Sequence, residues 1–207
     1  MITLAIDTST ARGAVASLRD DQPIAEETFE RDGLFHALQR LNPGHFDLIV
    51  IGVGPGSFTG IRAGIAAAKG LALPGARPIK AVSSFDALAL TALPDMPRDC
   101  QQMCVLCDAR RDEIYFAVYE RDGRRVGEVR IATFESIADE MHNPLWFVSA
   151  EIERFQTALK EVFGGFALVC ERPVYPSAVA LGWLGRKGDS NLPLEPIYLR
   201  ETEYRKL

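Results

Sequence analysis

The order of the predicted elements occurs twice along this chain, and that duplication limits its fold more than any other feature. In the first half, alternating and continuous apolar runs predict strands at residues 2–9, 13–19, 23–30, 47–53 and 78–82. Helical spacing of apolar residues predicts helices at residues 33–41, 59–73 and 84–93. The first six elements therefore follow the order strand, strand, strand, helix, strand, helix.

The second half follows the same order. We predict strands at residues 102–107, 113–119, 126–131 and 145–149, and helices at residues 134–141 and 151–163. Each half opens with a strand that ends in an aspartate, Asp7 in the first and Asp108 in the second. A duplicated βββαβα unit is the architecture of the actin, Hsp70 and sugar-kinase (ASKHA) superfamily, so we predict an α/β fold with two actin-like lobes.

Prolines mark the boundary between the two halves. Pro94 and Pro97 interrupt the stretch around residues 93–99, and proline breaks continuing helices and strands. We therefore predict an N-terminal lobe at residues 1–98 and a C-terminal lobe at residues 99–207. After residue 170 the pattern is weaker, and it indicates a helix at residues 178–184 and a closing strand at residues 196–200.

Charge and hydropathy exclude several classes of protein. The 207-residue chain has a formal net charge of −5, and an acidic chain binds nucleic-acid phosphates poorly by itself. The longest apolar runs, such as residues 48–53, have the length of a strand and not of a membrane span. No basic segment leads into an apolar run at the N-terminus. We therefore expect a cytoplasmic protein that does not cross a membrane.

Three cysteines have a spacing found in iron–sulfur proteins. Cys100, Cys104 and Cys107 read C-x-x-x-C-x-x-C, but the apolar residues around them predict a buried strand. Side chains three positions apart on a strand point to opposite faces, so Cys104 and Cys107 would not converge on one cluster. We expect reduced, structural cysteines.

The two strand-ending aspartates have the clearest link to phosphate chemistry. Asp7 is followed by Thr8 and Ser9, and a comparable turn in actin-like ATPases binds phosphate and places its aspartate near the metal. That turn normally has glycine where this chain has Ser9, and Ala109 and Arg110 after Asp108 also lack one. Two interpretations stay open: a vestigial nucleotide site, or aspartates that end strands and bond nearby backbone.

A glycine-rich turn, Gly54 to Ser57, leads into the helix predicted at residues 59–73. Such a turn can bind an anion through free backbone N–H groups. It lacks the dinucleotide fingerprint, the Lys-Ser/Thr pair of P-loop proteins and the nucleophile elbow of hydrolases. The alternative is a tight strand-to-helix turn capped by Ser57 or Thr59.

The helix after this turn has unusually small side chains, including Gly64 and Gly70. Because interior glycine costs about 1 kcal/mol relative to alanine, we infer that another element approaches this helix closely. That element is either the chain's own sheet or a second subunit, and both stay open. For a second subunit, the predicted interface consists of Gly60, Ile61, Arg62, Gly64, Ile65, Ala67, Ala68 and Leu71.

Several segments resemble the TsaB (YeaZ) family, glycoprotease-like proteins of tRNA threonylcarbamoyladenosine biosynthesis. The most specific is GVGPGSFTGIRAGIAAAKGLAL from residue 52, and AIDTST near the N-terminus accompanies it. The runs AVSS at 81–84, CDARRDEIY at 107–115 and PIYLR at 196–200 also fit. One departure is the first helix, which is shorter here than in the family, where it contributes to the partner interface.

The resemblance implies a non-catalytic partner subunit. In the family, the paralogue TsaD transfers the threonylcarbamoyl group to the adenosine next to the anticodon, TsaB supports it as a heterodimer partner, and the ATPase TsaE joins them. The resemblance thus implies no cofactor of this chain's own, ATP or ADP and magnesium at the complex, and tRNA bound through the complex. TsaD has an H-x-x-x-H metal pair, and His36, His45 and His142 do not have that spacing.

Three alternatives remain. A small actin-like ATPase or kinase would use Asp7 and Asp108 around a magnesium nucleotide. A self-associating homodimer would use the same small-residue helix. A protease is the weakest alternative, because Ser57 belongs to no visible Ser–His–Asp arrangement.

Overall fold

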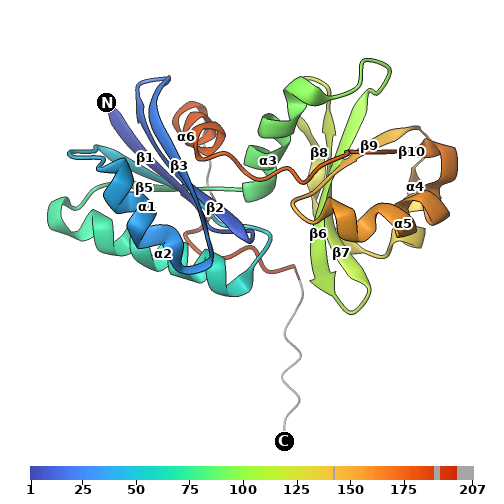
Figure 1. The fold of residues 1–207 in the computed structure, drawn as a ribbon, viewed down its shortest axis with the longest axis horizontal. Helices are drawn as coiled ribbons and strands as arrows, with labels where there is room; N and C mark the ends of the chain where they lie inside the picture. Colours follow the sequence, from blue (N-terminus) through green and yellow to red (C-terminus); the bar gives the residue numbers. More distant parts are fainter. Residues whose placement is uncertain (142, 189–191, 200–207) are drawn as a thin grey trace, which may run out of the picture.

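Two five-stranded mixed sheets form the two lobes of the computed structural model, which describes residues 1–141, 143–188 and 192–199 (Figure 1). The first sheet contains β1 (Ile2–Asp7), β2 (Arg12–Arg19), β3 (Gln22–Glu30), β4 (Leu48–Gly52) and β5 (Ile79–Val82). The second contains β6 (Gln102–Arg110), β7 (Glu113–Glu120), β8 (Arg125–Ala132), β9 (Leu145–Val148) and β10 (Ala167–Val169).

The two sheets have the same topology. The first has the order β3-β2-β1-β4-β5, and the second, taken in the same direction, has the order β8-β7-β6-β9-β10. In each sheet the opening strand pairs antiparallel with the next strand and parallel with the fourth. The duplicated βββαβα unit, and with it the actin-like α/β fold, is therefore confirmed.

The helices form layers on both faces of the sheets. The helices are α1 (Leu34–Leu41), α2 (Phe58–Ala72), α3 (Ser84–Ala92), α4 (Phe134–Glu140), α5 (Ile152–Phe163) and α6 (Ala178–Lys187). Figure 1 shows α1 and α2 on the outer side of the first sheet, α4 and α5 on the outer side of the second, and α3 and α6 between the sheets. Helices α3 and α6 thus lie closer to the middle of the molecule than α1, α4 and α5 do.

Helix α6 follows the second lobe in sequence but packs on the first sheet. Leu181 lies in the same buried cluster as Leu18 and Val50. A Cβ atom added at Gly182 would lie 2.6 Å from Leu18 Cδ1, and one at Gly185 would lie 2.5 Å from Val50 Cγ1. These glycines let the helix approach the sheet closely, and the chain returns to the first lobe after building the second.

Most predicted elements are confirmed to within a few residues, but two differ at the C-terminal end. Strand β10 was not predicted, and the strand predicted at residues 196–200 is wrong over 196–199, while Arg200 lies outside the described residues. Instead, Leu192 forms an isolated antiparallel bridge with Ala81, and the Ile197 amide donates to the Val53 carbonyl at 2.9 Å. Pro193 and Pro196 lack the N–H groups that a strand ladder needs.

Cys104 and Cys107 lie buried on strand β6, as the apolar pattern predicts. Burial raises the pKa of the Cys104 thiol to about 12 and that of Cys107 further still. Such thiols stay protonated at neutral pH and pack as small apolar groups. Of the helices in the described ranges, none combines the length and apolar character that crossing a membrane requires.

Candidate functional site

Asp7, at the end of β1, is buried inside the first lobe with only 1% of its surface exposed. Its Oδ1 accepts hydrogen bonds from the Ser9 amide at 2.9 Å and the Ser9 hydroxyl at 2.6 Å. Its Oδ2 accepts one from the Ser84 hydroxyl at 2.7 Å. Burial raises the pKa of Asp7, and the bonds from Ser84 and Ser9 offset only part of that effect.

Asp7 connects three elements of the first lobe. Its carboxyl group lies against the backbone of Gly52 in β4, where an added Cβ atom would be 1.9 Å from Asp7 Oδ2. The Ser84 hydroxyl, at the start of α3, also accepts a hydrogen bond from the Gly54 amide at 3.1 Å. The carboxyl group therefore holds β1, the glycine-rich turn and α3 together.

Asp108, the counterpart in the second lobe, is also held by groups of this chain. Its Oδ1 accepts from the Arg110 amide at 2.8 Å, and its Oδ2 accepts from Arg154 Nη1 at 2.6 Å. Glu151 Oε2 accepts from the Asp108 amide at 3.2 Å. Burial alone would raise the pKa of Asp108, but the Arg110 amide and the Arg154 guanidinium outweigh burial and lower it.

The two turns share one feature that bears on phosphate binding. In each, the amide two residues after the aspartate donates to that aspartate's own carboxylate. The amides of Ser9 and Arg110 are thus already used, and Asp7 is too deeply buried to reach a bound ion. These residues do not fit a magnesium nucleotide held as in actin-like ATPases, because that chemistry needs free donors and an accessible carboxylate.

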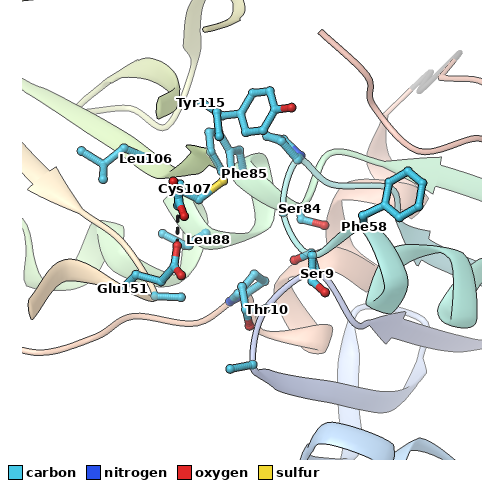
Figure 2. Close-up of a pocket in the computed structure, with 18 of the residues that line it drawn as sticks. Ser9, Thr10, Phe58, Ser84, Phe85, Leu88, Leu106, Cys107, Tyr115 and Glu151 are labelled. Atoms are coloured by element: carbon cyan, nitrogen blue, oxygen red, sulfur yellow. Dashed lines mark hydrogen bonds between the residues drawn. The ribbon is translucent and has the colours of Figure 1, made fainter. Parts of the chain in front are cut away.

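A cavity of about 480 Å³ separates the two turns (Figure 2). Polar groups from both lobes and apolar groups from α3 line it, among them Ser9, Thr10, Ser57, Ser84, Phe85, Leu88, Cys107, Asp108, Tyr115 and Glu151. Asp7 is not among the described residues that line it. The described ranges also contain no group of three His, Cys, Asp or Glu side chains that could hold a metal ion.

The glycine-rich turn packs against the β1–β2 turn of the same chain. The Ser57 amide donates to the Ser9 carbonyl at 2.6 Å, and the Thr8 hydroxyl donates to the Gly60 carbonyl at 2.8 Å. A Cβ atom at Gly60 would lie 2.1 Å from the Thr8 carbonyl oxygen. The Ser57 hydroxyl accepts from the Gly60 amide and caps α2, which confirms the tight, capped strand-to-helix turn.

The predicted interface residues on α2 lie on two faces of the helix. Five are buried against the chain's own first sheet, Gly60 and Leu71 are partly buried, and Arg62 is exposed; the five are Ile61, Gly64, Ile65, Ala67 and Ala68. A Cβ atom at Gly64 would lie 2.3 Å from Thr8 Oγ1, so packing within this chain explains that glycine. At Gly70 it would meet none of the described residues within 4 Å.

The opposite face of α2 is open to solvent. We call it the α2 outer face, and it consists of Thr59, Arg62, Ala63, Ala66, Lys69, Gly70 and, just past the helix end, Leu73. Leu73 is 80% exposed. Of the eight predicted interface residues, only Arg62 belongs to this face. Small residues occur on both faces of the helix, so periodicity alone does not say which face meets the sheet.

The burial of Asp7 gives a testable pH dependence. Because its pKa in the folded chain lies above the ordinary value of 3.8, the unfolded chain ionises first as pH rises, and stability falls until the folded carboxyl group also ionises. The Asp7→Asn variant keeps an oxygen that accepts from Ser9, but its amide group does not ionise in this pH range. We expect the stability of the wild type relative to this variant to fall by up to about 1.4 kcal/mol per pH unit in that window. Urea denaturation between pH 4 and 7.5 measures the free energy of unfolding of both proteins. Parallel pH profiles for the wild type and Asp7→Asn would contradict the prediction.

Comparisons with known proteins show which family this fold belongs to. A family model described as TsaD, tRNA N6-adenosine threonylcarbamoyltransferase, matches residues 35–167. An uncharacterised protein of Mycobacterium tuberculosis is 33% identical over 99% of this chain and 94% of that protein. The tRNA threonylcarbamoyladenosine biosynthesis protein TsaB of Bacillus subtilis is 28% identical over 98% of this chain and 96% of that protein.

Solved structures show the same relationship. YeaZ from Pseudomonas aeruginosa superposes with a TM-score of 0.76 at 25% identity, covering 96% of this chain and 99% of that chain. The family match extends over more than half of the chain, and the similarity to TsaB and YeaZ proteins extends over nearly all of it. This chain therefore belongs to the TsaB (YeaZ) family.

Proposed function

We propose that this chain is a non-catalytic subunit in the biosynthesis of threonylcarbamoyladenosine in tRNA, and that it binds and supports the TsaD paralogue. The observation that carries the proposal is that both phosphate-type turns are closed by their own aspartates in a member of the TsaB family. Because the Ser9 and Arg110 amides already have acceptors, they are not available to a phosphate, and this supports a scaffold role over phosphate chemistry.

We propose that the α2 outer face is the surface that binds TsaD. Gly70 supports this, because nothing in the described part of the chain approaches it although an exposed helix normally favours alanine by about 1 kcal/mol. Small residues let a second helix approach closely. Since TsaD is a paralogue, its equivalent helix can pair with this one about a pseudo-twofold axis, as in isologous dimers.

The remaining roles in the proposal belong to the complex. We propose that this chain has no cofactor of its own and that ATP or ADP and magnesium act elsewhere in the assembly, with TsaE as the ATPase. The net charge of −5 supports tRNA binding through the complex and not by this chain alone. A cytoplasmic location belongs to the same proposal.

Two titrations test this function. In the first, the TsaD paralogue from the same genome is titrated into this chain by calorimetry, and we expect a one-to-one complex. In the second, magnesium ATP is titrated into this chain alone, and we expect no binding. Failure to form a complex would contradict the scaffold role. Binding of ATP by the isolated chain would favour the alternative of a small actin-like ATPase or kinase.

A further inference from the structure

An exposed cluster of two aromatic rings and one arginine lies at the N-terminal end of α2. The Arg62 guanidinium carbon is 3.7 Å from the centroid of the Phe58 ring, and Arg62 Nε donates to the Tyr198 hydroxyl at 3.0 Å. The rings of Phe58 and Tyr198 are 5.7 Å apart. We call these three residues the Arg62 cluster. It joins residues 136 positions apart in the sequence.

The segment that supplies Tyr198 is anchored on the first lobe. Leu192 bridges to Ala81, the Ile197 amide donates to the Val53 carbonyl at 2.9 Å, and the Leu194 and Ile197 side chains pack against the first-lobe core. In Figure 1 this red segment passes the N-terminal end of α2. Tyr198 is therefore fixed beside Arg62 by backbone and side-chain contacts on both sides of Pro196.

The Arg62 cluster leaves apolar surface and hydrogen-bond donors open. Phe58 is 52% exposed and Tyr198 is 51% exposed, although both are large aromatic residues. Among the described residues, only Nε of Arg62 has a hydrogen-bond acceptor, and neither terminal nitrogen donates to any of them. Arg62 stacks over one ring and bonds the hydroxyl of the other through Nε, so its terminal nitrogens can bind a carboxylate in two-point geometry.

The cluster is continuous with the α2 outer face. Arg62 belongs to that face, which runs through Ala63, Ala66 and Gly70 to Leu73. The face thus has large side chains at both ends and mostly small ones between, with the long side chain of Lys69 beside Gly70. Arginine and aromatic residues are the types that dominate the binding energy of interfaces, whereas small residues provide close approach.

We propose that the Arg62 cluster anchors the interface with the TsaD paralogue by binding a carboxylate side chain flanked by apolar groups on the partner. This inference rests on the proposed function. Arg62 forms the two-point hydrogen bond, Phe58 and Tyr198 supply the apolar surface around it, and the C-terminal segment at residues 192–199 is part of the interface because it positions Tyr198.

The test is calorimetric titration of the TsaD paralogue into variants of the full chain. We expect Tyr198→Ala and Arg62→Lys each to weaken binding by about tenfold or more, the second because a lysine ammonium cannot form the two-point bond. Tyr198→Phe keeps the ring but removes the acceptor for Arg62 Nε, so we expect it to lose less affinity for TsaD than Tyr198→Ala. Phe166→Ala is the matched control, because Phe166 is a comparably exposed aromatic residue of the second lobe. We expect this variant to bind TsaD with the affinity of the wild type.

Three outcomes would overturn the inference. If the wild type binds TsaD and both Tyr198→Ala and Arg62→Lys bind within twofold of it, the anchor is wrong while the proposed function stands. If the wild type does not bind TsaD, the anchor and the proposed function are both wrong. If Tyr198→Ala instead disrupts self-association of this chain and leaves TsaD binding unchanged, the cluster belongs to a homodimer. Arg62→Lys changes only an exposed side chain, so it decides the question if Tyr198→Ala is destabilised.

Discussion

Ala66→Arg is expected to abolish binding of the TsaD paralogue while leaving this chain folded. Ala66 is exposed near the middle of the α2 outer face, between Ala63 and Gly70. An arginine there prevents the close approach of a partner helix and buries an unpaired charge at the contact. We expect the affinity to fall by about 100-fold or more. Titration calorimetry measures the affinity, and circular dichroism with thermal unfolding checks the fold.

The matched control for Ala66→Arg is Thr157→Arg, which places the same side chain at an exposed position of α5 in the second lobe. We expect this control to bind TsaD like the wild type. Substitution of Ala68, which is fully buried against the first sheet, would unfold the chain and cannot serve as a test of binding. Equal affinities for Ala66→Arg and Thr157→Arg would show that the α2 outer face is not the interface.

Gly52→Ala is expected to destabilise the chain by about 3–5 kcal/mol. The added Cβ atom would lie 1.9 Å from Asp7 Oδ2 and 2.7 Å from Ser84 Oγ. Neither atom can move freely, because Asp7 is held by Ser9 and Ser84, and Ser84 in turn accepts from the Gly54 amide. Gly52 itself is fixed in β4 by its pairing with Val82. The substitution therefore forces apart the elements that Asp7 connects.

Gly70→Ala provides the control for this second prediction. Its added Cβ atom would lie within 4 Å of no residue in the described ranges, and alanine favours the helix over glycine. We expect Gly70→Ala to stabilise the chain by up to about 1 kcal/mol, the opposite sign from Gly52→Ala. Urea denaturation at pH 7 measures both free energies of unfolding. A loss below about 1 kcal/mol for Gly52→Ala would contradict the packing described for Asp7.

The fold could be predicted from the sequence because its signal is local and occurs twice. The apolar periodicity of residues 2–30 and 102–131 identifies two sets of three strands. In each half, a helix, a strand and a second helix follow these three strands. The C-terminal end could not be predicted in the same way. Strand β10 has only three residues, and the described segment 192–199 contacts the first lobe through an isolated bridge, a backbone hydrogen bond and side-chain packing instead of a strand ladder.

The candidate site was only partly predictable for a related reason. Strand ends located Asp7 and Asp108, but sequence does not reveal that the amides of Ser9 and Arg110 donate to those carboxylates. Gly64 and Gly70 look equivalent in sequence, and only the folded structure shows that a Cβ atom at Gly64 would meet Thr8, whereas one at Gly70 would meet no described residue within 4 Å. The contact of Arg62 with Tyr198 depends on where the chain returns to the first lobe, which no local pattern contains.

The most direct measurement is the rate of threonylcarbamoyl-tRNA formation by the TsaD paralogue and TsaE, with and without this chain. The scaffold role predicts that modification requires the wild-type chain, that Asp7→Asn also supports it because Asp7 is a structural residue, and that Ala66→Arg does not. Modification that proceeds equally well without this chain would contradict the account. So would a folded, TsaD-binding Asp7→Asn variant that supports no modification, because Asp7 would then take part in the chemistry.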